Sequence, residues 1–308
     1  MTRRLAPSLA LTLALCGLAH AQAPAPSDFV VDVGENYHVY AGLTYLRANN
    51  QDLKLDVYVP WAVKEPNPTV IAFHGGGWVA GSKDGLVLHL LPYIEMGFTV
   101  VNVQYRLAST SPAPAAVEDC RCALRWVAAN AEKYRFDLSR LVTTGASAGG
   151  HLALTTALLP VAAGFDRPCP LPDAVRWVSG EIPEVRVAAA VNWFGITDVA
   201  DVVAGPNSKG WAVEWLGSRE DRLDLARRLS PLTYVRPGGP AVLSIHGDKD
   251  ALVPYAHAQR LHAALEQAGA RHKLLTVSGG GHGDFSLAER RRAFAEVRAF
   301  LADLRPKR

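Results

Sequence analysis

The chain has no excess of charge of either sign. Its 308 residues contain 32 Lys and Arg against 29 Asp and Glu, so the formal net charge is only +3. It has no basic run, heptad array or internal repeat, and no spacing of Cys and His typical of a metal site. The sequence therefore predicts no nucleic-acid partner and no bound metal.

Long hydrophobic runs are equally scarce. The clearest, residues 5–18, follows Arg3 and Arg4 and precedes residues 19–21 (Ala-His-Ala). A basic start, a short apolar stretch and an A-x-A site are typical of a cleaved signal peptide, here residues 1–21. The run is too short for a convincing transmembrane helix. We therefore expect a secreted or periplasmic protein with no stable membrane anchor.

Cysteine is rare too, with four in the chain. One lies in the expected leader, which leaves Cys120, Cys122 and Cys169. An oxidising compartment permits one disulfide and one free thiol. Cys120 and Cys122 are two positions apart on an expected helix and point in different directions. Cys169 is therefore the expected partner of one of them, and the sequence leaves open which.

The chain has the hydrophobic content and the length of one large folded domain. Hydrophobic residues make up 49% of the chain and charged residues 20%, which is typical of a globular protein with a sizeable core. The length favours a single α/β domain over residues 22–308. Strand and helix patterns alternate, which predicts a mostly parallel sheet with helices on both faces. The expected strands lie within 29–60 and at 69–73, 98–103, 141–144, 185–193, 240–245 and 273–277; the expected helices are 84–95, 115–131, 147–159, 255–269 and 287–304.

Polar and proline-rich segments are expected at the surface. Residues 161–184 contain four prolines and are expected to form an irregular excursion. Residues 197–235 are polar and loosely helical, and form either a small cap over the strand ends or a surface connection that touches no ligand. On the helix 115–131, a charged face is expected to be mostly solvated; it consists of Glu118, Asp119, Arg121 and Arg125.

The most informative motif is a serine in a glycine-flanked turn. Residues 145–149 (Gly-Ala-Ser-Ala-Gly) follow the apolar pair Leu141 and Val142 and open an apolar helix. A G-x-S-x-G turn between a buried strand and a helix presents the serine hydroxyl at a strained, exposed tip. The start of the helix also places unpaired N–H groups beside that hydroxyl. Ser147 is therefore the predicted nucleophile.

A second glycine run follows an earlier buried strand. Residues 69–73 are apolar and lead into residues 74–78 (His-Gly-Gly-Gly-Trp). Backbone N–H groups in such a loop are uncovered by side chains and can bind an anionic oxygen. We expect the N–H groups of Gly75, Gly76 and Ala148 to form an oxyanion hole, and the sequence does not decide whether Gly77 shares this role.

The nucleophile needs a base and an acid. His282 lies in a glycine-rich turn after the last expected strand, where its imidazole can take the Ser147 proton. A carboxylate must then hold the imidazole tautomer. Asp250, in the loop of the preceding strand, fits the order Ser, Asp, His. Asp248 is an alternative, either as turn residue or as acid, and Asp284 is another.

Four loops together resemble the α/β-hydrolase superfamily: residues 74–78, 145–151, 246–250 (His-Gly-Asp-Lys-Asp) and 281–283 (Gly-His-Gly). More narrowly, they are similar to HGGG-type esterases related to hormone-sensitive lipase and to acetylxylan and feruloyl esterases. The resemblance covers about residues 50–304 and implies an α/β-hydrolase fold with an eight-stranded sheet. The acid loop differs from the Asp-Pro-Leu form of many lipase relatives, which moves the match towards acetylxylan and feruloyl esterases and secreted peptidases.

This resemblance implies a serine carboxylesterase with no cofactor that acts through an acyl-enzyme. The implied substrates are short acyl or aryl esters, including acetyl or feruloyl groups on carbohydrate. Four aromatic residues near the loops are candidates for pocket walls, or else belong to the core: Trp78, Trp193, Phe194 and Phe285. Two other functions stay open, an arylformamidase-like amidase or serine exopeptidase, and a binding protein that has kept the fold without catalysis.

Overall fold

The computed structural model describes residues 26–170 and 182–304, which form two compact units, one up to Glu35 and one from Asn36. The expected signal peptide, residues 1–21, lies outside the described residues, as do positions 171–181 of the proline-rich segment. Residues Pro26–Asn36 form helix α1, so the expectation of a strand from Phe29 is wrong. β-branched valines favour a strand there by propensity, but a strand needs a partner, and ladder pairing begins only at Tyr37.

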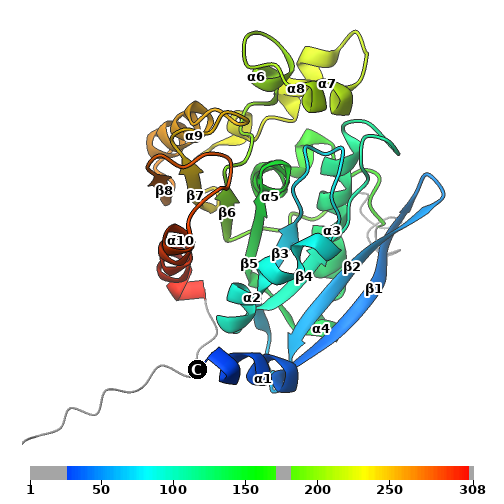
Figure 1. The fold of residues 1–308 in the computed structure, drawn as a ribbon. Helices are drawn as coiled ribbons and strands as arrows, with labels where there is room; N and C mark the ends of the chain where they lie inside the picture. Colours follow the sequence, from blue (N-terminus) through cyan, green and yellow to red (C-terminus); the bar gives the residue numbers. More distant parts are fainter. Residues whose placement is uncertain (1–25, 171–181, 305–308) are drawn as a thin grey trace, which may run out of the picture. The chain divides into compact units, whose positions relative to one another are not determined.

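One mixed sheet organises the second unit (Figure 1). The described residues form eight strands in the order β1-β2-β4-β3-β5-β6-β7-β8. Strand β2 runs antiparallel to β1 and β4, and all other neighbours are parallel, which confirms the predicted architecture. The strands are β1 (Tyr37–Ala48), β2 (Gln51–Pro60), β3 (Asn67–Phe73), β4 (Thr99–Val103), β5 (Phe136–Ala146), β6 (Ala189–Trp193), β7 (Ala241–Gly247) and β8 (His272–Val277).

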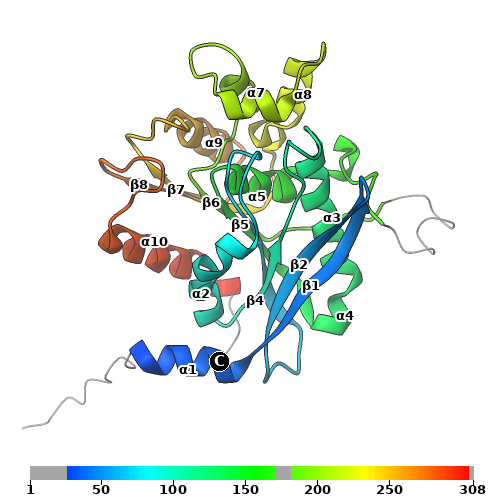
Figure 2. The same cartoon turned by 45° about the vertical axis from the view of Figure 1, so that its right-hand side comes forward.

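Helices cover both faces of this sheet (Figure 2). The helices described in this unit are α2 (Val87–Glu95), α3 (Ala115–Ala129), α4 (Ala131–Tyr134), α5 (Ala148–Leu158), α6 (Val199–Val203), α7 (Gly210–Leu216), α8 (Arg222–Arg228), α9 (Ala256–Gln267) and α10 (Leu287–Phe300). Thr143 and Thr144 of β5 show the two sides, because neighbouring strand residues point to opposite faces. The Thr143 hydroxyl donates to a carbonyl of α5, whereas the Thr144 hydroxyl bonds to Tyr93 of α2. None of the helices in the described ranges is long and apolar enough to cross a bilayer.

Asp119, Arg121 and Arg125 of α3 are buried, so the expectation of a mostly solvated charged face is wrong. Asp119 accepts a forked hydrogen bond from Arg106 at 2.7–3.1 Å. Arg121 and Arg125 both bind the carboxylate of Asp166, which is 1% exposed. The physical reason is that Asp166 supplies one shared counter-charge to both arginines, so neither is buried without an ion partner.

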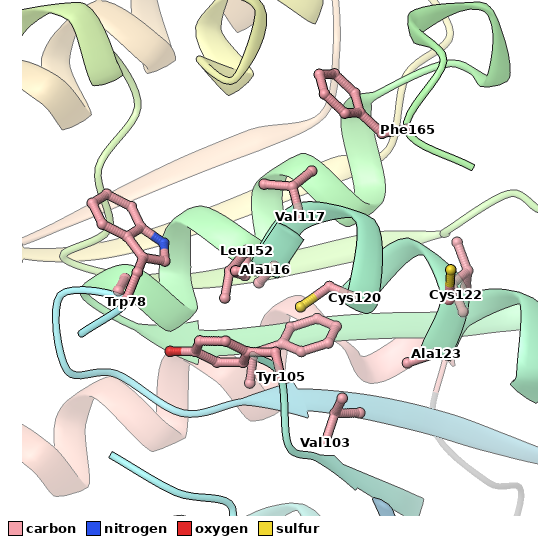
Figure 3. Close-up of a cluster of buried hydrophobic side chains, with 14 of the residues drawn as sticks. Trp78, Val103, Tyr105, Ala116, Val117, Cys120, Cys122, Ala123, Leu152 and Phe165 are labelled. Atoms are coloured by element: carbon pink, nitrogen blue, oxygen red, sulfur yellow. The ribbon is translucent and has the colours of Figure 1, made fainter. Parts of the chain in front are cut away.

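A disulfide joins the same segment to α3. Cys122 bonds to Cys169, which decides the pairing that the sequence left open, and Cys120 is a buried free thiol. Cys120 belongs to a hydrophobic cluster in which Trp78, Tyr105 and Leu152 are also buried (Figure 3). The two helices α3 and α5 are thereby held to one face of the sheet, with the start of α5 fixed at the end of β5.

Candidate active site

Ser147 lies at a sharp turn between β5 and α5. Its backbone has φ 56° and ψ −121°, a strained conformation for a residue with a Cβ. Both flanking glycines are required by close contacts: a Cβ at Gly145 would lie 2.6 Å from the Phe73 carbonyl oxygen, and one at Gly149 only 2.2 Å from it. The turn therefore packs directly on the end of β3 and raises the serine above the sheet.

Three side chains from separate loops meet at this turn. His282 Nε2 lies 2.9 Å from Ser147 Oγ, and His282 Nδ1 lies 2.7 Å from Asp250 Oδ2. When the Nδ1–H group donates to the carboxylate, Nε2 is free to accept the serine proton. The structure thus brings together the nucleophile, base and acid that the sequence predicted.

Asp250 is held as a buried carboxylate. Its Oδ1 accepts the backbone N–H groups of Leu252 and Val253 at 2.9 and 2.8 Å, and His246 Nε2 lies 3.2 Å from its Oδ2. Burial alone would raise the pKa of Asp250, but the hydrogen bonds from His246, His282 and Val253 outweigh it and hold the pKa well below its usual range. Asp250 is therefore ionised near neutral pH.

The two alternative candidates for the acid, Asp248 and Asp284, do not bond to His282. Asp248 Oδ1 accepts the backbone N–H of Gly279 at 2.8 Å, which ties the acid loop to the loop that carries His282. Asp284 forms no hydrogen bond with His282 in the part of the chain that the structure describes. Asp248 is thus a loop contact, and Asp250 alone of the three aspartates contacts the imidazole.

The glycine loop after β3 lies against the serine. A Cβ at Gly75 would be 3.8 Å from that of Ser147, whereas one at Gly77 would be 3.2 Å from the Trp211 side chain. Within residues 26–170 and 182–304, the backbone N–H groups of Gly75, Gly76, Gly77 and Ala148 donate to no protein acceptor. Unpaired donors beside a nucleophile are the arrangement that stabilises an oxyanion. These contacts place Gly75 beside Ser147 and Gly77 beside Trp211, and they leave open which of the glycine N–H groups point at the oxyanion.

His74 holds this loop in place. Its Nδ1–H donates to the Gly75 carbonyl at 2.8 Å, and its Nε2 accepts from Gln104 Nε2 at 3.2 Å. The ring stacks on Tyr105, whose hydroxyl donates to the His74 carbonyl. Burial lowers the pKa of His74 to about 4, so this ring stays neutral near pH 7 and keeps both bonds. The role of Gln104 was not assigned from the sequence, although residues 101–107 also resemble the esterase family, because that role depends on a contact between the ends of β3 and β4.

The comparisons with known proteins agree with this geometry. The family model described as BD-FAE matches residues 55–265, well over half of the chain. The chain belongs to the BD-FAE family of α/β-hydrolases. A second family model, described as TAP-like protein, matches residues 223–308.

Several of the proteins similar to this chain are named esterases. Esterase LipQ of Mycobacterium tuberculosis is 29% identical over 225 residues, which cover 72% of this BD-FAE chain and 51% of LipQ. The chain thus spans about half the length of this curated relative. The solved truncated carbohydrate esterase from gut microbiota is 25% identical, with a TM-score of 0.69 over 87% of this chain and 96% of that one. Thermogutta terrifontis esterase 2 phosphoramylated by tabun is 25% identical, with a TM-score of 0.71 over 89% and 97% of the two chains.

In this BD-FAE family member, a cavity of about 310 Å³ opens beside the turn that carries Ser147. Gly75 and Ala146 border it on the side of the serine turn, and α2 and α10 supply much of the remaining wall. Most of its lining is apolar, with Leu86, Leu90, Tyr93, Trp193, Phe194 and Phe294 among the contributors. Trp193 and Phe194 therefore lie where the sequence suggested pocket walls.

The other two aromatic candidates do not line this cavity. Trp78 is fully buried and stacks on Trp215 of α7 with ring centroids 4.0 Å apart. Phe285 is 5% exposed and packs edge-to-face against Phe194. Of the two places that the sequence left open for them, Trp78 and Phe285 occupy the core. The sequence missed Tyr93 and Phe294, whose place in the wall depends on how α2 and α10 pack together.

The segment 197–235 contacts the glycine loop without lining the cavity. It carries α6, α7 and α8, which lie together at the top of Figure 1. Trp211 of α7 lies against Gly77, and Asp201 of α6 accepts a 2.9 Å hydrogen bond from His257 of α9. None of the residues that line the cavity comes from this segment. It braces the end of the glycine loop and leaves this pocket uncovered.

Proposed function

We propose that this BD-FAE family member is a serine carboxylesterase that hydrolyses short-chain esters through an acyl-enzyme intermediate. The observation that carries the proposal is the hydrogen-bonded chain Ser147–His282–Asp250, which lies beside N–H groups that have no acceptor among the described residues. The relatives support it, since LipQ is named an esterase and the structurally similar esterase 2 is phosphoramylated by tabun.

Acylation follows from the positions of these groups. Ser147 Oγ attacks the ester carbonyl carbon while its proton moves to His282 Nε2, 2.9 Å away. Asp250 stabilises the resulting imidazolium, and the N–H groups of Gly75, Gly76 and Ala148 receive the charge on the carbonyl oxygen. When the ester C–O bond breaks, His282 returns the proton to the departing alkoxide, and the acyl group remains on Ser147.

Deacylation repeats these steps with a water molecule in place of the serine hydroxyl. His282 removes a proton from a water molecule as its oxygen attacks the acyl carbon, and the same amides hold the oxyanion. The Ser147 oxygen then leaves and takes its proton back from His282. One ester and one water become one alcohol and one carboxylic acid, with no change of oxidation state.

The cavity favours small substrates. Its volume of about 310 Å³ is at the lower end of the range for ligand pockets, and its wall is mostly apolar. We propose short acyl or aryl esters, including acetyl or feruloyl groups on carbohydrate. The structural neighbour described as a carbohydrate esterase supports the carbohydrate part of this proposal.

We also propose that the protein is exported, and this part of the proposal rests on the signal-peptide pattern of residues 1–21 alone. Cleavage after residues 19–21 would start the mature protein at Gln22. N-terminal sequencing of the secreted or periplasmic protein tests this: a first residue of Gln22 supports export, and an intact cytoplasmic chain contradicts it.

The activity is tested with a series of p-nitrophenyl esters from acetyl to octanoyl, with methyl ferulate, acetylated xylan and an aminoacyl anilide assayed in parallel. We expect kcat/KM to be highest for the short acyl chains and negligible for the anilide. Ser147→Ala serves as the inactive control. Cleavage of the anilide in preference to every ester would contradict the proposal, as would absence of hydrolysis by a folded wild-type protein.

A further inference from the structure

Phe194, in the turn that follows β6, has a backbone conformation that is unusual for a residue with a bulky side chain. Its φ is 39°, in the left-handed region that favours glycine. Such a conformation costs free energy and persists only where the surroundings fix it. Strained residues of this kind gather at functional sites, which indicates a role for this turn.

Backbone hydrogen bonds fix the turn relative to the nucleophile. The N–H group of Phe194 donates to the Ile245 carbonyl of β7 at 2.8 Å. The carbonyl of the preceding residue, Trp193, accepts the N–H group of Ser147 at 2.9 Å. The strained residue is therefore attached directly to the serine turn.

The Phe194 ring lies against the base. Its centroid is 4.8 Å from that of the His282 imidazole, with an angle of 65° between the two ring planes. A Cβ at Gly283 would be only 2.7 Å from Phe194 Cζ, so a side chain at that position would displace the ring. The glycine that follows the base in the chain thus allows the close approach of the phenyl ring to the imidazole.

The acyl-enzyme stage is where this contact matters for catalysis. In the free enzyme, hydrogen bonds to Ser147 and Asp250 align the imidazole. Acylation removes the hydroxyl proton of Ser147, so Nε2 of His282 loses that donor and must take a proton from water. The bond to Asp250 then remains, whereas the contact with Phe194 does not involve the serine oxygen and is kept. A shift of about 1 Å in a reacting group can cost on the order of a hundredfold in rate.

We propose that Phe194 is a positioning residue, whose ring keeps the His282 imidazole aligned with Ser147 and with the attacking water. This role rests on the proposed esterase function and goes beyond that of a cavity wall. A wall residue alone would change how tightly the substrate binds, and therefore KM. Loss of alignment slows the proton transfers, and therefore lowers kcat.

The test compares Phe194→Ala with Phe194→Gly, because both remove the ring and only glycine adopts a positive φ without strain. On p-nitrophenyl acetate, kcat should fall by about ten- to a hundredfold in both variants. The glycine variant should nevertheless unfold at a higher urea concentration than the alanine variant. A glycine variant with the kcat of wild type would show that only the backbone turn matters, and would overturn the inference. A raised KM with kcat within about threefold of wild type would do the same, since it is the result expected of a wall alone.

Proton NMR gives a readout that does not depend on turnover. The Nδ1–H group of His282, bonded to Asp250 at 2.7 Å, should give a downfield signal that is absent from His282→Ala. Exchange with water should broaden or remove this signal in Phe194→Ala, and an unchanged signal overturns the positioning role.

Phe165→Leu is the control for loss of a buried ring, because Phe165 is 3% exposed and does not line the cavity. Its kcat and its NMR signal should match those of wild type. A wild type that hydrolyses no ester would overturn the proposed function itself, and the NMR signal would then still decide whether Phe194 holds His282.

Discussion

Asp250 shows at the scale of single residues how the surroundings of a side chain set its role. It is 7% exposed, yet it bonds to two backbone N–H groups and to His282, and these contacts keep it ionised despite burial. Asp248, two positions earlier, bonds to Gly279 instead. The spacing in the sequence made Asp250 the better candidate, but only the contacts separate the two roles.

Replacing Asp250 or Asp248 by asparagine should affect kcat to very different extents. Asp250→Asn removes the charge that stabilises the imidazolium and can favour the wrong tautomer, so we expect kcat to fall by about 10⁴-fold. Asp248→Asn keeps an oxygen that can accept from Gly279, so kcat should change by less than about threefold. Steady-state kinetics on p-nitrophenyl acetate measures both. If the two variants exchange behaviour, the acid has been assigned wrongly.

At the scale of secondary-structure elements, helix α3 shows that a local sequence pattern does not reveal partners that are distant in the chain. Each of the four motif loops was predictable, because a short apolar run followed by glycine identifies the end of a buried strand. The two arginines on α3 were predicted to face solvent because nothing near them in the sequence indicates a partner. That partner is Asp166, more than 40 positions away, and it binds Arg121 and Arg125 together.

Loss of this shared carboxylate should destabilise the fold. Asp166→Asn leaves two buried guanidinium groups without their counter-ion, and we expect the free energy of unfolding to fall by about 3–5 kcal/mol. Asp224→Asn is the control, because its ion pair with Arg227 is exposed and should contribute little. Urea unfolding of both variants gives the comparison. Equal midpoints for the two variants would show that the buried cluster contributes no more than a surface pair.

At the scale of the whole molecule, burial controls the protonation of several histidines. Desolvation lowers the pKa of four of them from 6.5 to about 4: His74, His151, His257 and His262. Their positions, like the packing of α2 on α10 that forms the cavity wall, depend on contacts between distant elements. This is why the sequence predicted the sheet and the reacting groups but not the pocket wall that includes Tyr93 and Phe294.

These histidines predict a loss of stability in mild acid. Between pH 6.5 and 4 the unfolded chain binds protons that the folded chain excludes, so the free energy of unfolding falls as the pH is lowered through this window. Each such group adds up to about 1.4 kcal/mol per pH unit to the slope. Urea midpoints measured from pH 7 to pH 4.5 should show the decline.

His151→Phe should make that decline shallower, because His151 is fully buried and contributes to the slope. The exposed His89 provides a control, and His89→Gln should leave the slope as in wild type. A slope that is unaffected by the loss of His151 would mean that this ring is protonated to the same extent in the folded and unfolded chains.

The proposed catalysis requires Ser147 to form a covalent bond with the substrate as its proton moves to His282. Intact-mass measurement and peptide mapping after exposure to a fluorophosphonate test this directly. We predict a single adduct on Ser147 in the wild type, none in Ser147→Ala, and a rate of formation at least about a hundredfold slower in His282→Ala. A folded wild-type protein that gains no adduct, or gains one at another residue, would contradict the account.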